Sequence, residues 1–175
     1  MALATPRELF VHELSDTLSA EHIVLKMLDE LVGEVGHKDV KAAFKHHQSE
    51  TKQQIRNVEK VFKALGEEPE ETTCHAAEGL RKEHDALKEE QPSPEVLQMG
   101  NLGGAAKTEH YEIASYTLLV QMAKDLGEKE AADLLKENLD QEKAMAKTVE
   151  SLALELGKDV KAQVREEAKQ EKATV

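Results

Sequence analysis

Apolar residues recur every three or four positions through most of this chain, which is the spacing of one face of an α-helix. The pattern is continuous in four long segments, at residues 6–35, 40–65, 94–126 and 131–156. A glycine follows each segment, as expected where helices end. The connections at 36–39 and 127–130 are so short that each predicts an antiparallel neighbour, and hence two helical hairpins.

The segment between the two hairpins has a different character. Residues 67–73 are acidic and polar, a short helix is predicted over about 74–90, and Pro92-Ser93-Pro94 marks the start of the next long helix. A link of this length can run back along the bundle. We therefore predict an all-α, up-down-down-up four-helix bundle over residues 1–157. Residues 158–175 have few large apolar residues and are predicted to form a C-terminal tail outside the core.

The two hairpins look like copies of one another. A shift of 91 residues superimposes Gly36 on Gly127 and Gly66 on Gly157, whereas a shift of 88 aligns Glu21 with Glu109. The two registers differ by about one helical turn. Both remain open, and both predict two hairpins joined by a crossover.

Acidic residues interrupt the apolar face of each long helix near its midpoint. In an antiparallel bundle the midpoints meet at one level, so these carboxylates should converge in the core. Several buried anions repel one another and lose their hydration, and bound divalent cations relieve both costs. Inward glutamates on all four helices are the arrangement of ferritin-like di-iron carboxylate proteins. The sequence thus predicts a metal site whose candidate residues are Glu21, His47, Glu50, Gln54, Glu109, Glu112 and Glu142.

Each of these residues also has a simpler interpretation. In so acidic a chain, the Glu-x-x-Glu spacing arises by chance on many surface helices. His47 alone would more often be a hydrogen-bonded structural histidine, and Gln54 would more often orient a ligand or face solvent. Tyr116 fits core packing better than a bond to a ligand, and His22 and His110 should point aside. The coincidence of four helices at one level is what favours a metal.

Composition and charge narrow the classes of partner. The chain has 175 residues, enough for one domain, and aromatic residues make up 3%. A net charge of −12 disfavours binding to DNA or RNA. No hydrophobic signal run and no membrane-spanning segment are evident. With Cys74 as its single cysteine, the chain is predicted to be a cytoplasmic protein.

Several short motifs resemble those of the YciF/YciE-like family of ferritin-like bacterial stress proteins. The resemblance covers nearly all of residues 8–157. It implies a ferritin-like bundle with extra helices, commonly a homodimer, and a dinuclear site for two metal ions, with iron favoured and manganese an alternative. It also implies that Glu109 and Glu112 are paired carboxylates. The matching motifs are Glu13-Leu14-Ser15-Asp16, Ala20-Glu21, Phe44 with His47, Glu50-Thr51, Gln54, Thr73-Cys74, Glu78-Gly79-Leu80, Glu109-His110-Tyr111-Glu112-Ile113-Ala114, Tyr116, Leu139-Asp140 and Glu142-Lys143.

The chain departs from the family pattern in three places. Leu18-Ser19 stand where the family usually has Tyr and Asp, and Gln141 precedes Glu142 where two glutamates are usual. No Glu-x-x-His occurs on the second or fourth long helix, and His47-x-x-Glu50 offers the reverse order. A site poor in nitrogen ligands would bind iron less firmly and could hold Mn²⁺, or Mg²⁺ or Ca²⁺.

Two functional hypotheses follow. The first is a dinuclear oxidoreductase, of ferroxidase or peroxidase/catalase type, with O₂ or peroxide as substrate. In that hypothesis Glu21 and Glu142 are terminal ligands, Glu50 and Glu109 bridge, and Glu112 shifts with oxidation state. The second is a non-catalytic stress or dimerisation protein whose metal is structural or absent, and the scarcity of histidines favours it.

Overall fold

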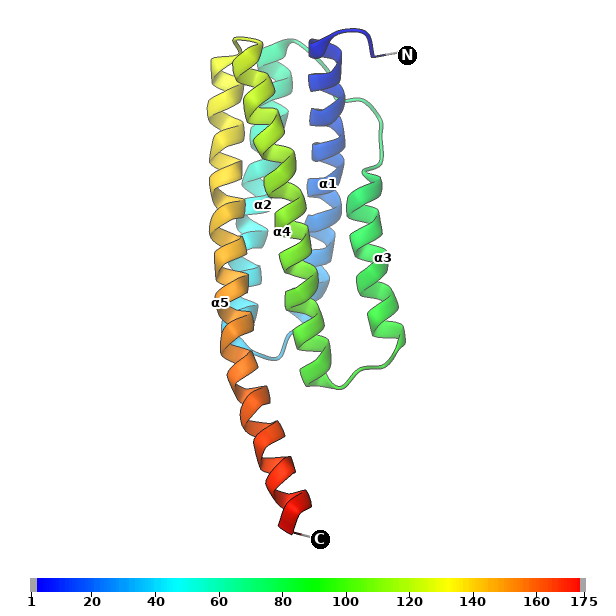
Figure 1. The fold of residues 1–175 in the computed structure, drawn as a ribbon. Coiled ribbons are helices and arrows are strands. Elements are labelled where there is room, and N and C mark those ends of the chain that lie inside the picture. Colours follow the sequence, from blue (N-terminus) through cyan, green and yellow to red (C-terminus); the bar gives the residue numbers. More distant parts are fainter. Residues whose placement is uncertain (1–2, 174–175) are drawn as a thin grey trace.

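The computed structural model describes residues 3–173, which form helices and no strand. The chain folds as a helical bundle, which confirms the predicted class (Figure 1). Each predicted helix is present. The helices are α1 (Pro6–Glu34), α2 (Lys38–Leu65), α3 (His75–Glu89), α4 (Pro94–Asp125) and α5 (Lys129–Ala173).

The four long helices are arranged as two hairpins. Helices α1 and α5 run in one direction and α2 and α4 in the other, so the bundle is up-down-down-up (Figure 1). Each helix packs on two antiparallel neighbours, in the cyclic order α1, α2, α5, α4. Helix α3 lies outside this bundle, against α1 and α4, and the crossover that contains it brings the chain back to the start of α4.

The helix ends follow from local chemistry. Thr5 and Glu8 form a complete capping box at the start of α1, and Pro6 occupies the first turn. After α2 and α4 the chain turns at Gly66 and Gly127, where φ is 69° and 79°. These are left-handed conformations in which a side chain would be strained, so glycine is favoured both at the start of the crossover and in the turn between α4 and α5.

The prediction that the last helix ends at Gly157 was wrong. Helix α5 continues through Gly157 to Ala173, and its C-terminal part projects beyond the other helices (Figure 1). A glycine inside a helix costs only about 1 kcal/mol relative to alanine, and the Lys, Glu and Ala residues that follow are strong helix formers. Residues 174–175 of the predicted tail lie outside the described residues. Whether 158–173 act separately from the bundle remains a prediction.

The core consists of two apolar clusters with a polar layer between them. One cluster joins the start of α1 and α5 to the end of α2 and α4, and its largest members include Phe10, Leu14, Phe62, Leu119 and Leu135. The other joins the opposite helix ends and includes Leu28, Phe44, Leu102, Met145 and Val149. The buried polar side chains between the clusters come from all four long helices. This layer is where the sequence predicted the carboxylates to converge.

Candidate metal centre

Four buried side chains from three helices approach one another in this polar layer. Each offers one nitrogen or oxygen atom, and these atoms all lie within 4.8 Å of one another. The group could hold a metal ion, since imidazole and carboxylate are ligands of first-row divalent metals. We refer to it as the acidic cluster: His47 on α2, Glu109 and Glu112 on α4, and Glu142 on α5.

The imidazole of His47 joins the acidic cluster to a carboxylate at its edge. Its Nδ1 lies 3.3 Å from Oε2 of Glu50, and its Nε2 lies 3.4 Å from Oε1 of Glu109. Oε2 of Glu142 is 3.6 Å from the same Nε2. Glu50 is half-buried and its other oxygen lies 3.3 Å from Nε2 of His46, so it faces two histidines. A histidine that ligates a metal usually gives its second nitrogen to such a carboxylate.

Gln54 touches the acidic cluster through a hydrogen bond. Its Nε2 donates to Oε1 of Glu142, and its own side chain is fully buried. The amide thereby fixes the orientation of that carboxylate. Oε2 of Glu142 is left without a hydrogen-bond partner among the described residues.

Glu21 on α1 is held by a chain of polar side chains. Tyr116 Oη donates to Oε1 of Glu21, and Asn138 Nδ2 in turn donates to Tyr116 Oη at 3.0 Å. Asn57 Nδ2 donates to Asn138 Oδ1 at 2.9 Å, so the chain crosses α1, α4, α5 and α2. All four side chains are buried. Glu21 is therefore oriented on one oxygen and free on the other.

Sequence reasoning found the carboxylates but missed part of this network. Tyr116 was expected to pack rather than to bond a candidate ligand. Asn57 and Asn138 were not singled out. Asn138 lies on the apolar stripe of its helix, where a buried amide needs hydrogen-bond partners, and this position could have been recognised. His22 and His110 are exposed, which agrees with the expectation that they point aside.

Burial disfavours the ionised form of the carboxyls in this layer. Desolvation is the largest cause that raises the pKa of Glu21, Glu109 and Glu112 well above the usual range, and the charge of Glu142 is the next. Desolvation also raises the pKa of Glu142 itself. These shifts describe carboxyls that prefer to be neutral when no cation accompanies them.

The donor atoms fit a divalent cation. Four carboxylate oxygens and one ring nitrogen in the layer are buried and meet no hydrogen-bond partner among the described residues. Unpaired buried acceptors of this kind are costly, and a cation compensates them. They are Oε2 of Glu21, Glu109, Glu112 and Glu142, and Nε2 of His47.

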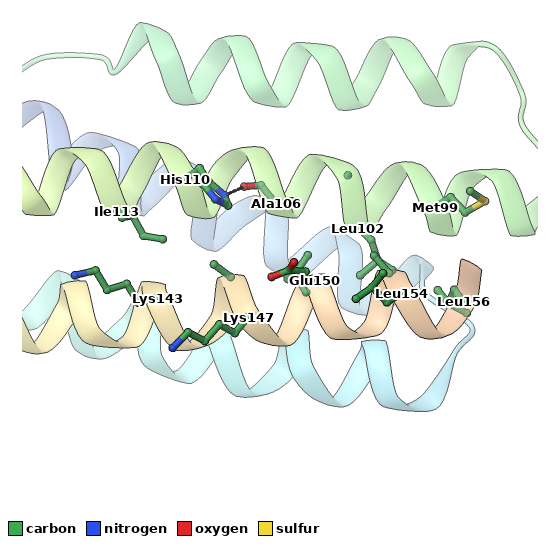
Figure 2. Close-up of a pocket in the computed structure, with 14 residues that line it drawn as sticks. Met99, Leu102, Ala106, His110, Ile113, Lys143, Lys147, Glu150, Leu154 and Leu156 are labelled. Carbon is green, nitrogen blue, oxygen red and sulfur yellow. Dashed lines mark hydrogen bonds between the residues drawn. The ribbon is translucent and has the colours of Figure 1, made fainter. Parts of the chain in front are cut away.

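A groove on the surface is a separate feature. It has a volume of about 710 Å³, lies between α4 and α5, and is lined by apolar side chains and by His110, Lys143, Lys147 and Glu150 (Figure 2). None of the acidic-cluster residues lines it. Over the part of the chain that the structure describes, no helix is apolar over a long enough stretch to cross a bilayer.

Comparison with known proteins gives consistent relatives. Residues 5–165 match the family model described as a domain of unknown function, DUF892. The chain is 36% identical to Protein YciF of Escherichia coli K12 over 155 residues, which is 88% of this chain and 93% of that protein.

Solved structures agree with this assignment. The crystal structure of the E. coli stress protein YciF matches with a TM-score of 0.86 at 35% identity, over 89% of this chain and 99% of that one. YcfI from Rhodopseudomonas palustris matches with a TM-score of 0.81 at 33% identity, over 84% of this chain and 94% of that one. A protein from Xanthomonas campestris, 23% identical with a TM-score of 0.71 over 94% of this chain and 99% of that one, shares the fold.

Proposed function

The chain belongs to the YciF-like family of bacterial stress proteins, DUF892, and on this basis we propose that it is a dinuclear metal protein that reacts with O₂ or peroxide. The observation that carries the proposal is the group of unpartnered carboxylate oxygens between the two apolar clusters. A bundle that needed no metal would fill these positions with apolar side chains, at no cost in buried charge.

The geometry suggests how the residues divide the work. The acidic cluster and Glu21 would hold two ions, with iron favoured and manganese as the alternative. The carboxylate of Glu50 lies next to Nδ1 of His47 and so would orient the imidazole with its Nε2 toward the ions. Gln54 and Tyr116 would hold Glu142 and Glu21 in ligand orientation through their hydrogen bonds. This assignment replaces the bridging role first suggested for Glu50.

A pair of iron or manganese ions would supply the one-electron steps that reduction of O₂ or peroxide requires. The chain itself provides the surroundings. The apolar clusters on either side keep bulk water out of the layer.

A second candidate function is a non-catalytic stress protein in which the metal is structural or absent. One observation favours it, namely that His47 is the single imidazole in the acidic cluster. A structural role has also been suggested for the relative YcfI. The two candidates differ in whether bound metal is oxidised.

We also propose that the protein forms a homodimer through the groove between α4 and α5. Leu154 and Met99 line it and are 67% and 49% exposed, so the groove presents two large apolar side chains close to its other apolar lining. Lys147 and Glu150 lie about one turn apart on α5 (Figure 2). A second copy related by a two-fold axis perpendicular to α5 would run its α5 antiparallel and place lysine opposite glutamate, which gives a self-complementary interface.

The metal proposal is tested by anaerobic titration of the full-length protein with Fe(II), followed by O₂ or hydrogen peroxide. We expect two irons per chain and rapid oxidation. Glu112→Ala should remove stoichiometric binding, and Glu142→Ala should do the same. His110→Ala, which changes an exposed histidine of α4, should bind like the parent. Binding without oxidation above the buffer rate would support the second candidate, and parental binding by both glutamate variants would refute the site.

The dimer proposal is tested separately by sedimentation. Leu154→Glu should convert the protein to a monomer. Leu118→Glu is the matched control, because Leu118 is 47% exposed on α4 and does not line the groove. A monomeric parent, or a dimeric Leu154→Glu variant, would contradict the proposed interface.

A further inference from the structure

A second, much smaller cavity adjoins the acidic cluster on the side of the bundle that α3 covers. It lies between α1, α3 and α4 and has a volume of about 20 Å³. A single water molecule needs roughly 10–15 Å³ of such volume. Its polar lining residues are His84, Asn101, Thr108 and Glu109.

Besides Glu109, two polar side chains in this lining each have one buried atom without a hydrogen-bond partner among the described residues. Asn101 is 2% exposed and its Oδ1 meets no hydrogen-bond donor among the described residues. His84 is 9% exposed and its Nε2 is also unpaired, since Oε2 of Glu34 lies 3.7 Å away. A buried polar group that is left without a hydrogen-bond partner destabilises the folded state. A small molecule that both donates and accepts hydrogen bonds would remove both costs.

The cavity also reaches the proposed metal centre. Glu109 lines the cavity, and Oε1 of the same carboxyl lies 3.4 Å from Nε2 of His47 in the acidic cluster. His84, which also lines the cavity, has its Nε2 3.7 Å from Oε2 of Glu34, and the other oxygen of Glu34 forms an ion pair with the partly exposed Lys88. The cavity is therefore lined both by a residue of the acidic cluster and by a residue that contacts a surface ion pair.

The walls decide which molecules can enter. Most of the lining is aliphatic, including Val24, Leu28 and Leu31 on α1. A cation would lose its hydration shell there without gaining enough oxygen ligands, and a bulky organic molecule exceeds the volume. We propose that this cavity admits and holds one small, neutral, hydrogen-bonding molecule, of the class of water and hydrogen peroxide, and passes it to Glu109. The delivery step rests on the proposed function, whereas the binding step does not.

Met27 makes the proposal testable in the metal-free protein. Met27 lines the cavity although the residue is only 8% exposed. Hydrogen peroxide that enters transfers one oxygen atom to the sulfur, which gives methionine sulfoxide and water. Met145 is the internal control because it is 3% exposed and lines no part of the cavity. Met122, which is half-buried on α4 and lines neither the cavity nor the groove, is the accessible control.

We would treat the metal-free, full-length protein with hydrogen peroxide or with tert-butyl hydroperoxide and follow each methionine by peptide mass spectrometry. Hydrogen peroxide should oxidise Met27 at least about tenfold faster than Met145, which must wait for local opening of the fold. The bulky hydroperoxide should oxidise Met122 and leave Met27 as slow as Met145. Equal rates at the two buried methionines, or equal access by both oxidants, would overturn the proposal.

A pair of glycine variants supplies the second test. Gly104 lines the cavity, and a Cβ there meets no atom within 4 Å, so Gly104→Val adds bulk without a clash at its first carbon. Gly103→Val makes the same change one residue away, on the exposed side of α4. Gly104→Val should slow Met27 oxidation by about an order of magnitude and Gly103→Val should not. Similar Met27 rates in both variants would refute the route. Because no metal is present, failure of the metal proposal would leave these results unchanged.

Discussion

Replacing Glu112 by glutamine should stabilise the metal-free protein at neutral and higher pH and not in acid. Glu112 is 2% exposed, and its Oε2 has no hydrogen-bond partner among the described residues. Burial first, and the charge of Glu142 next, raise the pKa of its carboxyl well above the usual range. The folded protein therefore holds a proton that the unfolded chain releases. The stability that this carboxyl contributes is fully present below its unfolded pKa and is lost as the pH rises.

The size of the effect can be bounded. Each pH unit above the ordinary pKa of 4.5 costs the folded state about 1.4 kcal/mol, so the cost at pH 7 is at most about 3 kcal/mol. A glutamine has the same shape and no charge. Its amide would pair imperfectly, at a cost of about 1 kcal/mol or more. The net gain should be about 1–2 kcal/mol near pH 7–8 and close to zero near pH 5.

Thermal unfolding followed by far-ultraviolet circular dichroism measures this difference. For a chain of 175 residues, 1 kcal/mol shifts Tm by roughly 2–4 °C. Glu137→Gln serves as control because it makes the same change at an exposed position of α5. A Glu112→Gln variant that melts below the parent near pH 8, or that gains equally near pH 5, would show that the carboxyl is not held neutral by its surroundings.

Three further outcomes are expected. The guanidinium midpoint of the metal-free parent should fall as pH rises above about 4.5, because the raised carboxyl pKa values of Glu21, Glu109 and Glu112 all act in that direction. Mn²⁺ at a hundred times its Kd should raise the free energy of unfolding again by about 3 kcal/mol. A midpoint that rises with pH would contradict the raised pKa values. Tyr116→Phe should cost about 1–3 kcal/mol in urea unfolding, since its hydroxyl serves both Glu21 and Asn138, and an unchanged midpoint would mean that this network adds no stability. Gly127→Ala should lower Tm by an amount equivalent to about 1 kcal/mol because φ is 79° there, whereas Gly157→Ala, inside α5, should raise it by up to about the same amount. Equal effects of the two alanines would refute the assigned backbone roles.

The fold was predictable because its signals are periodic and local. Glycines at 66 and 127 and the capping residue Thr5 mark helix ends through backbone geometry that acts within one turn. Gly157 is the same residue type but has no left-handed backbone conformation, and the strong helix formers after it continue the helix. Sequence alone cannot distinguish a glycine that ends a helix from one inside it.

The candidate site was predictable in its carboxylates and less so in its supports. Acidic residues at apolar-stripe positions are conspicuous, so Glu21, Glu109, Glu112 and Glu142 could be found from spacing. Their orientation depends on residues on other helices, such as Asn138, whose partners are fixed by how the hairpins dock. Helix spacing gives the level of a side chain along the bundle. It does not give the rotation that decides which oxygen faces which nitrogen.

The acidic cluster draws its members from both hairpins, and the crossover with α3 is the only covalent connection between those hairpins. Ion binding and the docking of the two hairpins are therefore thermodynamically linked. Any ion that prefers the assembled cluster must strengthen docking by the same free energy with which docking strengthens ion binding. The stability of the folded chain in a cell would then depend on the supply of free metal, and metal starvation would weaken the packing between the two hairpins.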